Sequence, residues 1–523
     1  MKPQSEGLNT VGRMRLFTKT TFFIMIYTAG CAFNFGYDVG NFGGVQGMQS
    51  FGKVFGKYYA DKHKYALPAY LSSVMTSVPF FGKVLAPLLN CVFLSQGVVS
   101  GAWIGQRFGR KKAIAVLIIN GIIGIVLQTS ATTAAQFTIG RIINFGTTGL
   151  TIIVVPIYLA ETSPRELRGM MNATIQLMII LGQLVASLVN LGTKNINNNA
   201  GWQIPVGLQF VPAGVLAALW CFLPESPRWL LSQHRTDDAV KSLQRLSKKS
   251  KPLIEVESDI AMLQRDHANE SKGTWAEVFD KTNRRRTAVA VLAMFGQQIT
   301  GQAFVSQYSV IFYQQEGFTS QAFLFTVLNN VVQLVCLIMT WFLVDGLGRR
   351  PILLFGAMMM AVFLFILGGI STMSDPTQAA RHMSVASVML FGAGYSLSWA
   401  PVSYIVVSEA ASTRVKEKTN LLACVISVLT TFVTSFTIPY LINSQYAGLG
   451  GKVGFVYGSI SLLLFFAAYM YIPELKNRSL EEVDRLFASD TPMRKFRHVK
   501  TQAVETMAPD DILEVQYTKD EEN

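Results

Sequence analysis

Charge is scarce in this sequence of 523 residues: 15% of the side chains are Asp, Glu, Lys or Arg, and 50% are hydrophobic. A soluble protein of this length would carry charge on about a quarter of its residues. Cysteine is rare too, and all five cysteines lie in apolar runs, which argues against a disulfide or metal framework. The five histidines lie outside the predicted spans, and no nucleophile with a base, metal cluster or phosphate loop is present. The sequence therefore predicts no enzyme, no cofactor and no metal site.

The net charge of +13 comes from short basic patches rather than from a basic face with interleaved aromatics, so nucleic-acid binding is rejected. The patches follow apolar runs on alternate connections, which is typical of cytoplasmic loops. They lie at 107–112, 165–168, 284–286, 349–350 and 414–418. An even number of spans, about twelve, would place both termini in the cytoplasm.

One apolar stretch does not fit a simple count of spans. From Tyr65 to Ile104 the only charged residue is Lys83, so the run is too long for one span, while two spans would invert every later loop. The loop charges favour a single span, centred near residue 92. The surplus is then either an outer segment lying on the protein or an insertion around 86–99.

The sequence repeats itself in two halves. The pattern at 107–111 returns at 346–350, Glu161 returns as Glu409, and Pro224-Glu225 returns as Pro473-Glu474. Duplicated six-span halves are typical of secondary transporters. The predicted divisions are a cytoplasmic N-terminus at 1–17, an N-terminal half at 18–223, a cytoplasmic linker with short helices at 224–286, a C-terminal half at 287–472 and a cytoplasmic tail at 473–523. The linker has helical spacing at 237–248 and 254–266, and the tail has it at 480–487.

Two charged residues of opposite sign stand inside apolar runs. Asp38 interrupts the first run and Arg141 the fourth. A carboxylate within a span costs at least a few kcal/mol unless it lies in a cavity, finds a partner or is protonated. Asp38 and Arg141 are therefore predicted to form a proton-responsive pair. The alternative is that Asp38 lies at a wet helix end and serves as a cap.

From about Phe33 to Phe487 the chain resembles the sugar porter family of the major facilitator superfamily, in particular its fungal members. The motifs that carry the resemblance are Gly-Tyr-Asp at 36–38, Gly-Arg at 140–141, PIYLAETSPRELRG at 156–169, PESPRWL at 224–230, QQITG at 297–301, DGLGRR at 345–350 and PELKNRSL at 473–480. The resemblance implies an all-α integral membrane protein with the major facilitator fold and two pseudo-symmetric six-helix halves.

The resemblance also implies residue roles. Asp38 would be the proton-coupling carboxylate, with Arg141 as its partner. The implied solute-binding residues are Phe35, Gln176, Gln183, Gln297, Gln298, Gln333 and Tyr404. The implied cytoplasmic gate consists of Arg107, Arg110, Glu161, Arg168, Asp345, Arg349, Arg350 and Glu409. The plain alternatives remain open: buried amides that hold helices together, aromatics facing lipid or core, and solvated charge pairs.

Three expected contacts of the C-terminal half depart from the family pattern, where Ala303, Tyr404 and Ser427 replace an Asn, a Trp and an amide. We predict a monomeric multi-pass protein, in a plasma-membrane bilayer, that moves a sugar or sugar-like polyhydroxy solute with a proton. The departures keep open a carrier, for uptake or export, of a non-sugar metabolite such as a quinate-like acid or a secondary metabolite. A non-transporting nutrient sensor is the third alternative.

Overall fold

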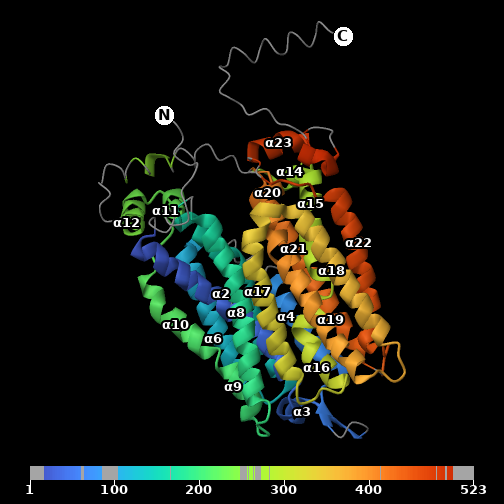
Figure 1. Ribbon diagram of the computed structural model, residues 1–523. Coiled ribbons are helices and arrows are strands. Elements are labelled where there is room, and N and C mark those ends of the chain that lie inside the picture. The colour runs from blue at the N-terminus through green and yellow to red at the C-terminus, as the bar shows by residue number, and fades with distance from the viewer. Residues whose placement is uncertain are drawn as a thin grey trace, which may run out of the picture.

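The computed structural model describes most of the chain and is built almost entirely of helices (Figure 1). It describes residues 17–60, 64–84, 104–164, 167–247, 256, 258, 260–262, 264, 273–281, 283–412, 414–443, 445–476, 478, 480–488 and 492–498. In this part of the chain the single sheet is a short hairpin.

The N-terminal half contains six long helical segments. They are α2 (Lys19–Val45), α4 (Ala69–Val84), α6 (Arg110–Thr129), α7 (Ala134–Thr162), α8 (Arg168–Thr193) and the divided segment α9 (Ala200–Gly207), α10 (Phe210–Leu219) and η2 (Trp220–Phe222). Side-chain caps begin two of them: the Thr18 hydroxyl accepts the Thr21 N–H at the start of α2, and Thr133 does the same for α7.

The C-terminal half repeats this plan with two interrupted helices. Its segments are α15 (Arg284–Ile299) continued by the π-helix η3 (Phe304–Tyr308) and α16 (Ser309–Gln315), α17 (Ala322–Leu347), α18 (Arg349–Ile370), α19 (Gln378–Leu397) continued by α20 (Trp399–Ala410), α21 (Lys416–Ile442), and η4 (Gly450–Lys452) with α22 (Val453–Tyr471). Gly301, with φ of 95°, separates α15 from η3.

The second span begins earlier in the chain than predicted. Helix α4 starts at Ala69, directly after Pro68, and its described part ends at Val84. The described part of the second span thus lies entirely before residue 92, where its centre was predicted, so that prediction is wrong for the described residues. Between α2 and α4 lie α3 (Gln49–Phe55) and the antiparallel strands β1 (Lys57–Tyr59) and β2 (Lys64–Ala66), with Tyr58 opposite Tyr65. The possible insertion at 86–99 lies outside the described residues.

Short helices gather at one end of the bundle, where α2 begins and α22 ends (Figure 1). They are α11 (Pro227–Ser232), α12 (Thr236–Leu246), α14 (Trp275–Phe279), α23 (Leu480–Ala488) and η5 (Met493–His498). We call this the basic end, because Arg110 and Arg349 begin helices there. The predicted helices at 237–248 and 480–487 are confirmed as α12 and α23, whereas 254–266 lies largely outside the described residues.

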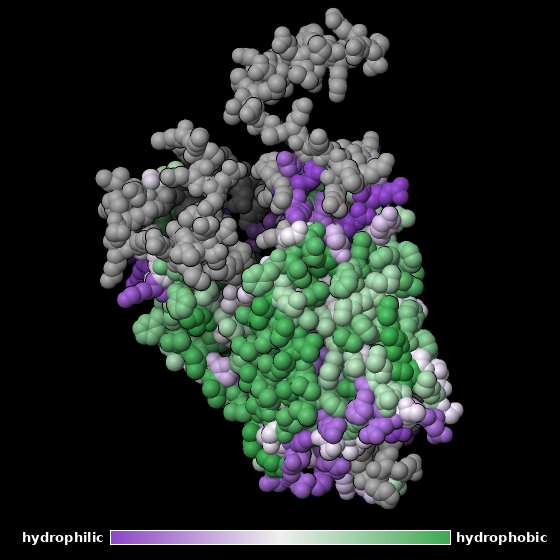
Figure 2. All heavy atoms as spheres, in the orientation of Figure 1, coloured by the Kyte–Doolittle hydropathy of each residue, from purple (hydrophilic) through white to green (hydrophobic). Residues whose placement is uncertain are grey.

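The bundle has the surface of a membrane protein. Figure 2 shows a broad hydrophobic band across the visible face, with hydrophilic residues gathered above and below it. Within the described residues, ten helical segments are long and apolar enough to cross a membrane. Helix α2, which spans 27 residues, and α4 lie in the same bundle. This arrangement agrees with the predicted count of about twelve spans.

Glycine allows α2 and α8 to pack backbone against backbone. A Cβ atom on Gly36 would lie 2.0 Å from the Ile179 carbonyl oxygen, and one on Gly182 would lie 2.3 Å from the Phe33 carbonyl oxygen. No side chain fits in such gaps, and small residues are what permit close approach of spanning helices. The contact fixes the face of α2 that carries Phe35 against the face of α8 that carries the predicted glutamines.

Candidate functional site

A cavity of about 150 Å³ lies between the two halves. The structure brings all seven predicted solute-binding residues to its wall: Phe35 from α2, Gln176 and Gln183 from α8, Gln297 and Gln298 from α15, Gln333 from α17 and Tyr404 from α20. The three departures from the family pattern, Ala303, Tyr404 and Ser427, line the same cavity. Residues from both repeats therefore form one polar pocket inside an apolar bundle.

The N-terminal wall offers two amides that have no hydrogen-bond partner in the described part of the chain. Within the described residues, neither the Gln176 nor the Gln183 side chain makes a hydrogen bond, although the Gln183 carbonyl accepts one from Asn330 Nδ2 at 3.3 Å. The two glutamines are seven residues apart and so share a helix face. An amide that is free to donate and accept suits a hydroxyl, which does both.

The C-terminal wall is formed where two helices are interrupted. Gln297 Nε2 donates to the carbonyl oxygens of Trp399 at 3.3 Å and Ala400 at 2.8 Å, which lie at the junction of α19 and α20. Gln298 Nε2 in turn donates to Gln297 Oε1 at 2.9 Å. Gln297 thus ties α15 to the first turn of α20 and orients Gln298. Interrupted helices beside a central site are a common feature of secondary transporters.

Asp38 and Arg141 are both buried, with 5% and 3% of their surfaces exposed. Within the described residues no salt bridge joins them, although each attracts the other electrostatically, so their pairing stays a prediction. Asp38 Oδ1 instead accepts from Gln209 Nε2 at 3.4 Å, and Gln209 Oε1 accepts from Asn144 Nδ2 at 3.0 Å. The Arg141 guanidinium lies 3.7 Å from the centroid of the Phe42 ring. Asp38 Oδ2 has no hydrogen-bond partner in the described part of the chain.

Sequence reasoning assigned no role to three polar residues of this region. Asn144 and the buried Gln209, at the junction of α9 and α10, join Asp38 to a chain of amides. Lys83 of α4 lines the cavity while only 5% of its surface is exposed. The signal for Lys83 was available, because it is a charge inside an apolar run, as Asp38 is.

The basic end repeats one ion pair in each half. Arg110 Nε and Nη2 donate to the two oxygens of Glu161 at 2.9 and 2.8 Å, a two-point contact with both side chains 14% exposed. Arg349 Nη2 donates to Glu409 Oε1 at 2.9 Å. Arg350 was predicted to join this pair, but its guanidinium donates to the carbonyls of Arg494 and Tyr469 instead.

The other predicted gate residues are placed only in part. Arg107 is exposed and lies beside the Phe108 ring, 6.0 Å from its centroid. Arg168 and Asp345 fall in α8 and α17, but their side chains lie outside what the structure describes.

A second repeated element caps helices at the basic end. Glu225 accepts the backbone N–H groups of Arg110 at 2.9 Å and Lys111 at 3.1 Å, at the start of α6. Glu474 accepts those of Arg349 and Arg350, at the start of α18, at 3.1 and 3.0 Å. These carboxylates explain the repeated Pro-Glu pairs of the sequence, because an anion at a helix N-terminus meets free N–H groups and a favourable dipole.

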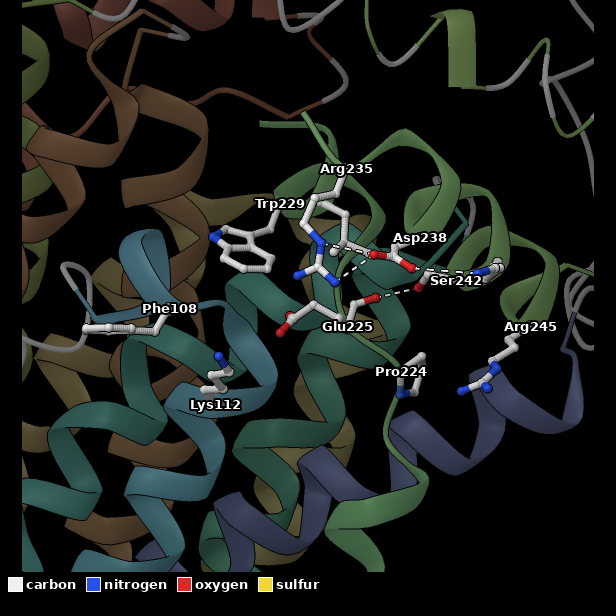
Figure 3. Close-up of a pocket in the computed structure, with 11 residues that line it drawn as sticks. Phe108, Lys112, Pro224, Glu225, Trp229, Arg235, Asp238, Ser242 and Arg245 are labelled. Atoms are coloured by element: carbon white, nitrogen blue, oxygen red, sulfur yellow. Dashed lines mark hydrogen bonds and ion pairs between the residues drawn. The ribbon is translucent and has the colours of Figure 1, made fainter. Parts of the chain in front are cut away.

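Glu225 lies in a cavity of about 280 Å³ beneath α11 and α12. In Figure 3, dashed lines join Arg235 to Asp238 and Ser242 to Glu225, so the linker helix α12 is tied to the capping segment. Burial raises the pKa of the Glu225 carboxyl, while the backbone N–H donors oppose this rise. These contacts hold the linker against the N-terminal half.

Several hydrogen bonds join the two halves at the end opposite the basic end. Gln314 Nε2 donates to the Gly47 carbonyl at 3.0 Å, and Ser73 Oγ donates to the Phe436 carbonyl at 2.6 Å. Lys194 Nζ donates to the Ser320 carbonyl at 2.6 Å. The halves are thus in direct contact on the side of the cavity away from the linker helices.

The sequence matches the family described as "Sugar (and other) transporter" over residues 23–487. The chain belongs to the sugar transporter family. Among curated relatives, it is 28% identical over 475 residues to the major facilitator-type transporter ecdD of Aspergillus rugulosus, covering 87% of this chain and 84% of ecdD. It is 28% identical over 473 residues to the low-affinity glucose transporter HXT3 of Saccharomyces cerevisiae, covering 87% of this chain and 80% of HXT3.

Solved structures of XylE show the same fold as this sugar transporter family member. XylE from E. coli in a partially occluded inward-open conformation aligns with a TM-score of 0.71 and 22% identity, covering 88% of this chain and 100% of XylE. A structure described as the proton:xylose symporter XylE bound to 6-bromo-6-deoxy-D-glucose aligns with a TM-score of 0.68 and 23% identity, covering 90% and 99%. The predicted family and major facilitator fold are confirmed, and the relatives are transporters rather than enzymes.

Proposed function

We propose that this protein is a secondary active transporter that moves a sugar or sugar-like polyhydroxy solute together with a proton by alternating access. The observation that carries the proposal is the central cavity, whose wall combines amides from both halves with aromatic rings. Amides suit hydroxyl-rich solutes because both groups donate and accept. The printed names of HXT3 and XylE, a glucose transporter and a proton:xylose symporter, support the same class of solute.

Proton coupling is assigned to Asp38, with Arg141 as the nearby cation. Asp38 is buried, has one oxygen with no hydrogen-bond partner among the described residues, and is linked through Gln209 to Asn144. A change in the separation of Asp38 and Arg141 between conformations would change the proton affinity of the carboxylate, because an opposite charge favours the ionised form. Proton uptake and release would then follow the conformational cycle.

We assign the basic end to the cytoplasmic side of the plasma membrane, since Lys and Arg are concentrated in cytoplasmic loops. With that orientation the contacts that join Gly47, Ser73 and Lys194 to the C-terminal half close the outer side. The structure then corresponds to a conformation closed toward the outside. The sensor alternative is disfavoured because Asp38 and Arg141, which proton-coupled transport would use, are both present and buried.

Uptake of labelled hexoses, disaccharides, polyols and quinate by transporter-deficient yeast, at acidic and neutral outer pH, tests the proposal. We expect acid-stimulated accumulation of one class by the wild type, and loss of accumulation with retained equilibrating uptake in Asp38→Asn. The exposed Asp375→Asn makes the same chemical change away from the cavity and serves as the control. Surface-localised, folded protein that moves none of the solutes would disprove the proposal.

A second candidate is a carrier of a non-sugar metabolite on the same scaffold. The observation that favours it is the altered C-terminal wall, where Ala303 and Ser427 present a methyl group and a short hydroxyl in place of amides. The quinate arm of the uptake panel separates this candidate from a neutral-sugar carrier.

A further inference from the structure

The described residues that line the cavity carry one positive charge and no negative one. Lys83 is the only charged residue among the described residues that line it, since the other polar members are amides, hydroxyls and tyrosines. Lys83 is 5% exposed, which rules out an ammonium that reaches bulk water along the lipid face. Within the described residues it makes no ion pair, and Asp38 is not within salt-bridge distance of it.

Three aromatic rings hold the Lys83 ammonium on the cavity wall. The nitrogen lies 4.9 Å from the centroid of Phe35, 5.0 Å from that of Phe80 and 5.2 Å from that of Phe145. The faces of aromatic rings stabilise a cation by electrostatic attraction, most strongly where water is excluded. Phe35 and Phe80 also line the cavity, so the cage opens toward the space a solute would occupy.

The buried charges of the described interior also show an excess of positive charge. Five charged residues of the described chain are buried, and two of them, Arg286 and Glu474, are satisfied at the basic end. The other three are Asp38, Lys83 and Arg141, which together carry one negative and two positive charges. A cation buried in a span is costly unless a negative charge compensates it, and among the described residues Lys83 and Arg141 share the attraction of one carboxylate, Asp38. A carboxylate on the solute would supply a second negative charge.

We propose that the solute of this transporter is a polyhydroxy carboxylate, whose carboxylate pairs with Lys83 while its hydroxyls bind the facing amides. This inference rests on the proposed transport of a polyhydroxy solute and narrows its class. The amides of Gln176 and Gln183, which have no described protein partner, supply the hydroxyl contacts. A charge-assisted hydrogen bond to a carboxylate is about twice as strong as a neutral one, so Lys83 would dominate selection.

The test compares matched acids and neutral sugars with purified full-length protein in lipid nanodiscs, by binding, and in proteoliposomes, by uptake. D-glucuronate and D-glucose share a ring and differ in a carboxylate, and quinate and D-gluconate extend the acid set. Lys83→Met removes the charge at similar length, and Lys83→Arg keeps it. Lys53→Met, on the exposed face of α3, is the control. Size-exclusion profile and melting temperature confirm that each variant is folded.

We expect wild type and Lys53→Met to bind at least one acid about tenfold or more tightly than D-glucose. Lys83→Met should lose that preference by a similar factor, and Lys83→Arg should keep most of it. Acid binding that is unchanged in folded Lys83→Met, or a wild type that binds and moves D-glucose but not the acids, would overturn the inference alone. A folded wild type that moves neither acids nor neutral sugars would overturn the proposed function as well.

Discussion

The two halves of the molecule share one architecture but differ in the charge that they place inside the membrane. The buried interior charges Asp38, Lys83 and Arg141 all belong to the N-terminal half. The C-terminal half contributes amides, hydroxyls and aromatic rings to the cavity, and its described buried charges lie at the basic end. The difference suggests a division of work in which one half couples ions to transport and the other shapes the pocket around the neutral part of the solute.

Arg141→Met should produce the largest effect of the substitutions that break this division. Removal of the guanidinium takes away the stronger of the two positive charges that favour ionised Asp38, the other being Lys83, so Asp38 would stay protonated over more of the cycle. We expect acid-driven accumulation to be lost, by about tenfold or more, while equilibrating uptake continues. The accumulation ratio in proteoliposomes with an imposed pH gradient measures this. Normal accumulation in Arg141→Met, judged against the exposed Arg381→Met, would exclude Arg141 from coupling.

Gln183→Leu and Gln298→Leu compare the two walls directly. Each removes one amide that faces the cavity, and a hydrogen bond to a solute hydroxyl is worth about 1 kcal/mol, so KM should rise up to about tenfold. Concentration-dependent uptake gives KM, and the imposed-gradient assay gives the accumulation ratio. The ratio should stay near the wild-type value for both. A fall in the ratio for Gln298→Leu would contradict the division between the halves.

Arg110→Met and Arg349→Met test whether the repeated ion pairs are equivalent. Arg110 meets Glu161 through Nε and Nη2 with both side chains 14% exposed, whereas Glu409, which accepts from Arg349 Nη2, is 27% exposed. Pairs that are only partly buried contribute about 1 kcal/mol or less, so transport rates should fall by a few-fold at most. The larger fall is expected for Arg110→Met. Initial uptake rates at saturating solute, corrected for surface expression, provide the comparison.

Ala303→Asn should produce the smallest effect and would sharpen the comparison. Ala303 lines the cavity on the C-terminal side, next to the π-helix η3. An amide there adds one hydrogen-bonding group for a solute hydroxyl, worth about 1 kcal/mol at most after the cost of fitting it beside its neighbours. A drop of a few-fold in KM for neutral hexoses is expected. An unchanged KM, with the variant folded and at the surface, would show that this position does not meet the solute.

Much of the fold and the cavity followed from the sequence because the relevant signals are local. A carboxylate or guanidinium in an apolar run is conspicuous, so Asp38 and Arg141 were found, and the repeated motifs predicted two halves. The boundaries of α4 were not predicted, because the long uncharged run after Tyr65 hides where a helix begins, although Pro68 marks the point. Hydropathy therefore predicted the number of spans more accurately than the residues at which they begin and end.

Side-chain pairing could not be predicted from the sequence, because it depends on how helices face one another. Arg349 and Arg350 are adjacent in the chain, yet only Arg349 faces Glu409, since neighbouring residues on a helix point about 100° apart. Gln209, between α9 and α10, meets Asp38 of α2 although the two residues are far apart in the sequence. Contacts of this kind become visible only when the bundle is assembled.

The close packing of α2 on α8 has a consequence for how this family member can change its specificity over evolution. Gly36 and Gly182 approach the partner helix so closely that even a methyl group would meet its backbone. Substitutions at these glycines are therefore not tolerated. The relative placement of α2 and α8, and with it the wall that carries Phe35 and Gln183, stays the same. New solutes would be gained mainly through replacements across the cavity, where Ala303 and Ser427 already differ from the family pattern.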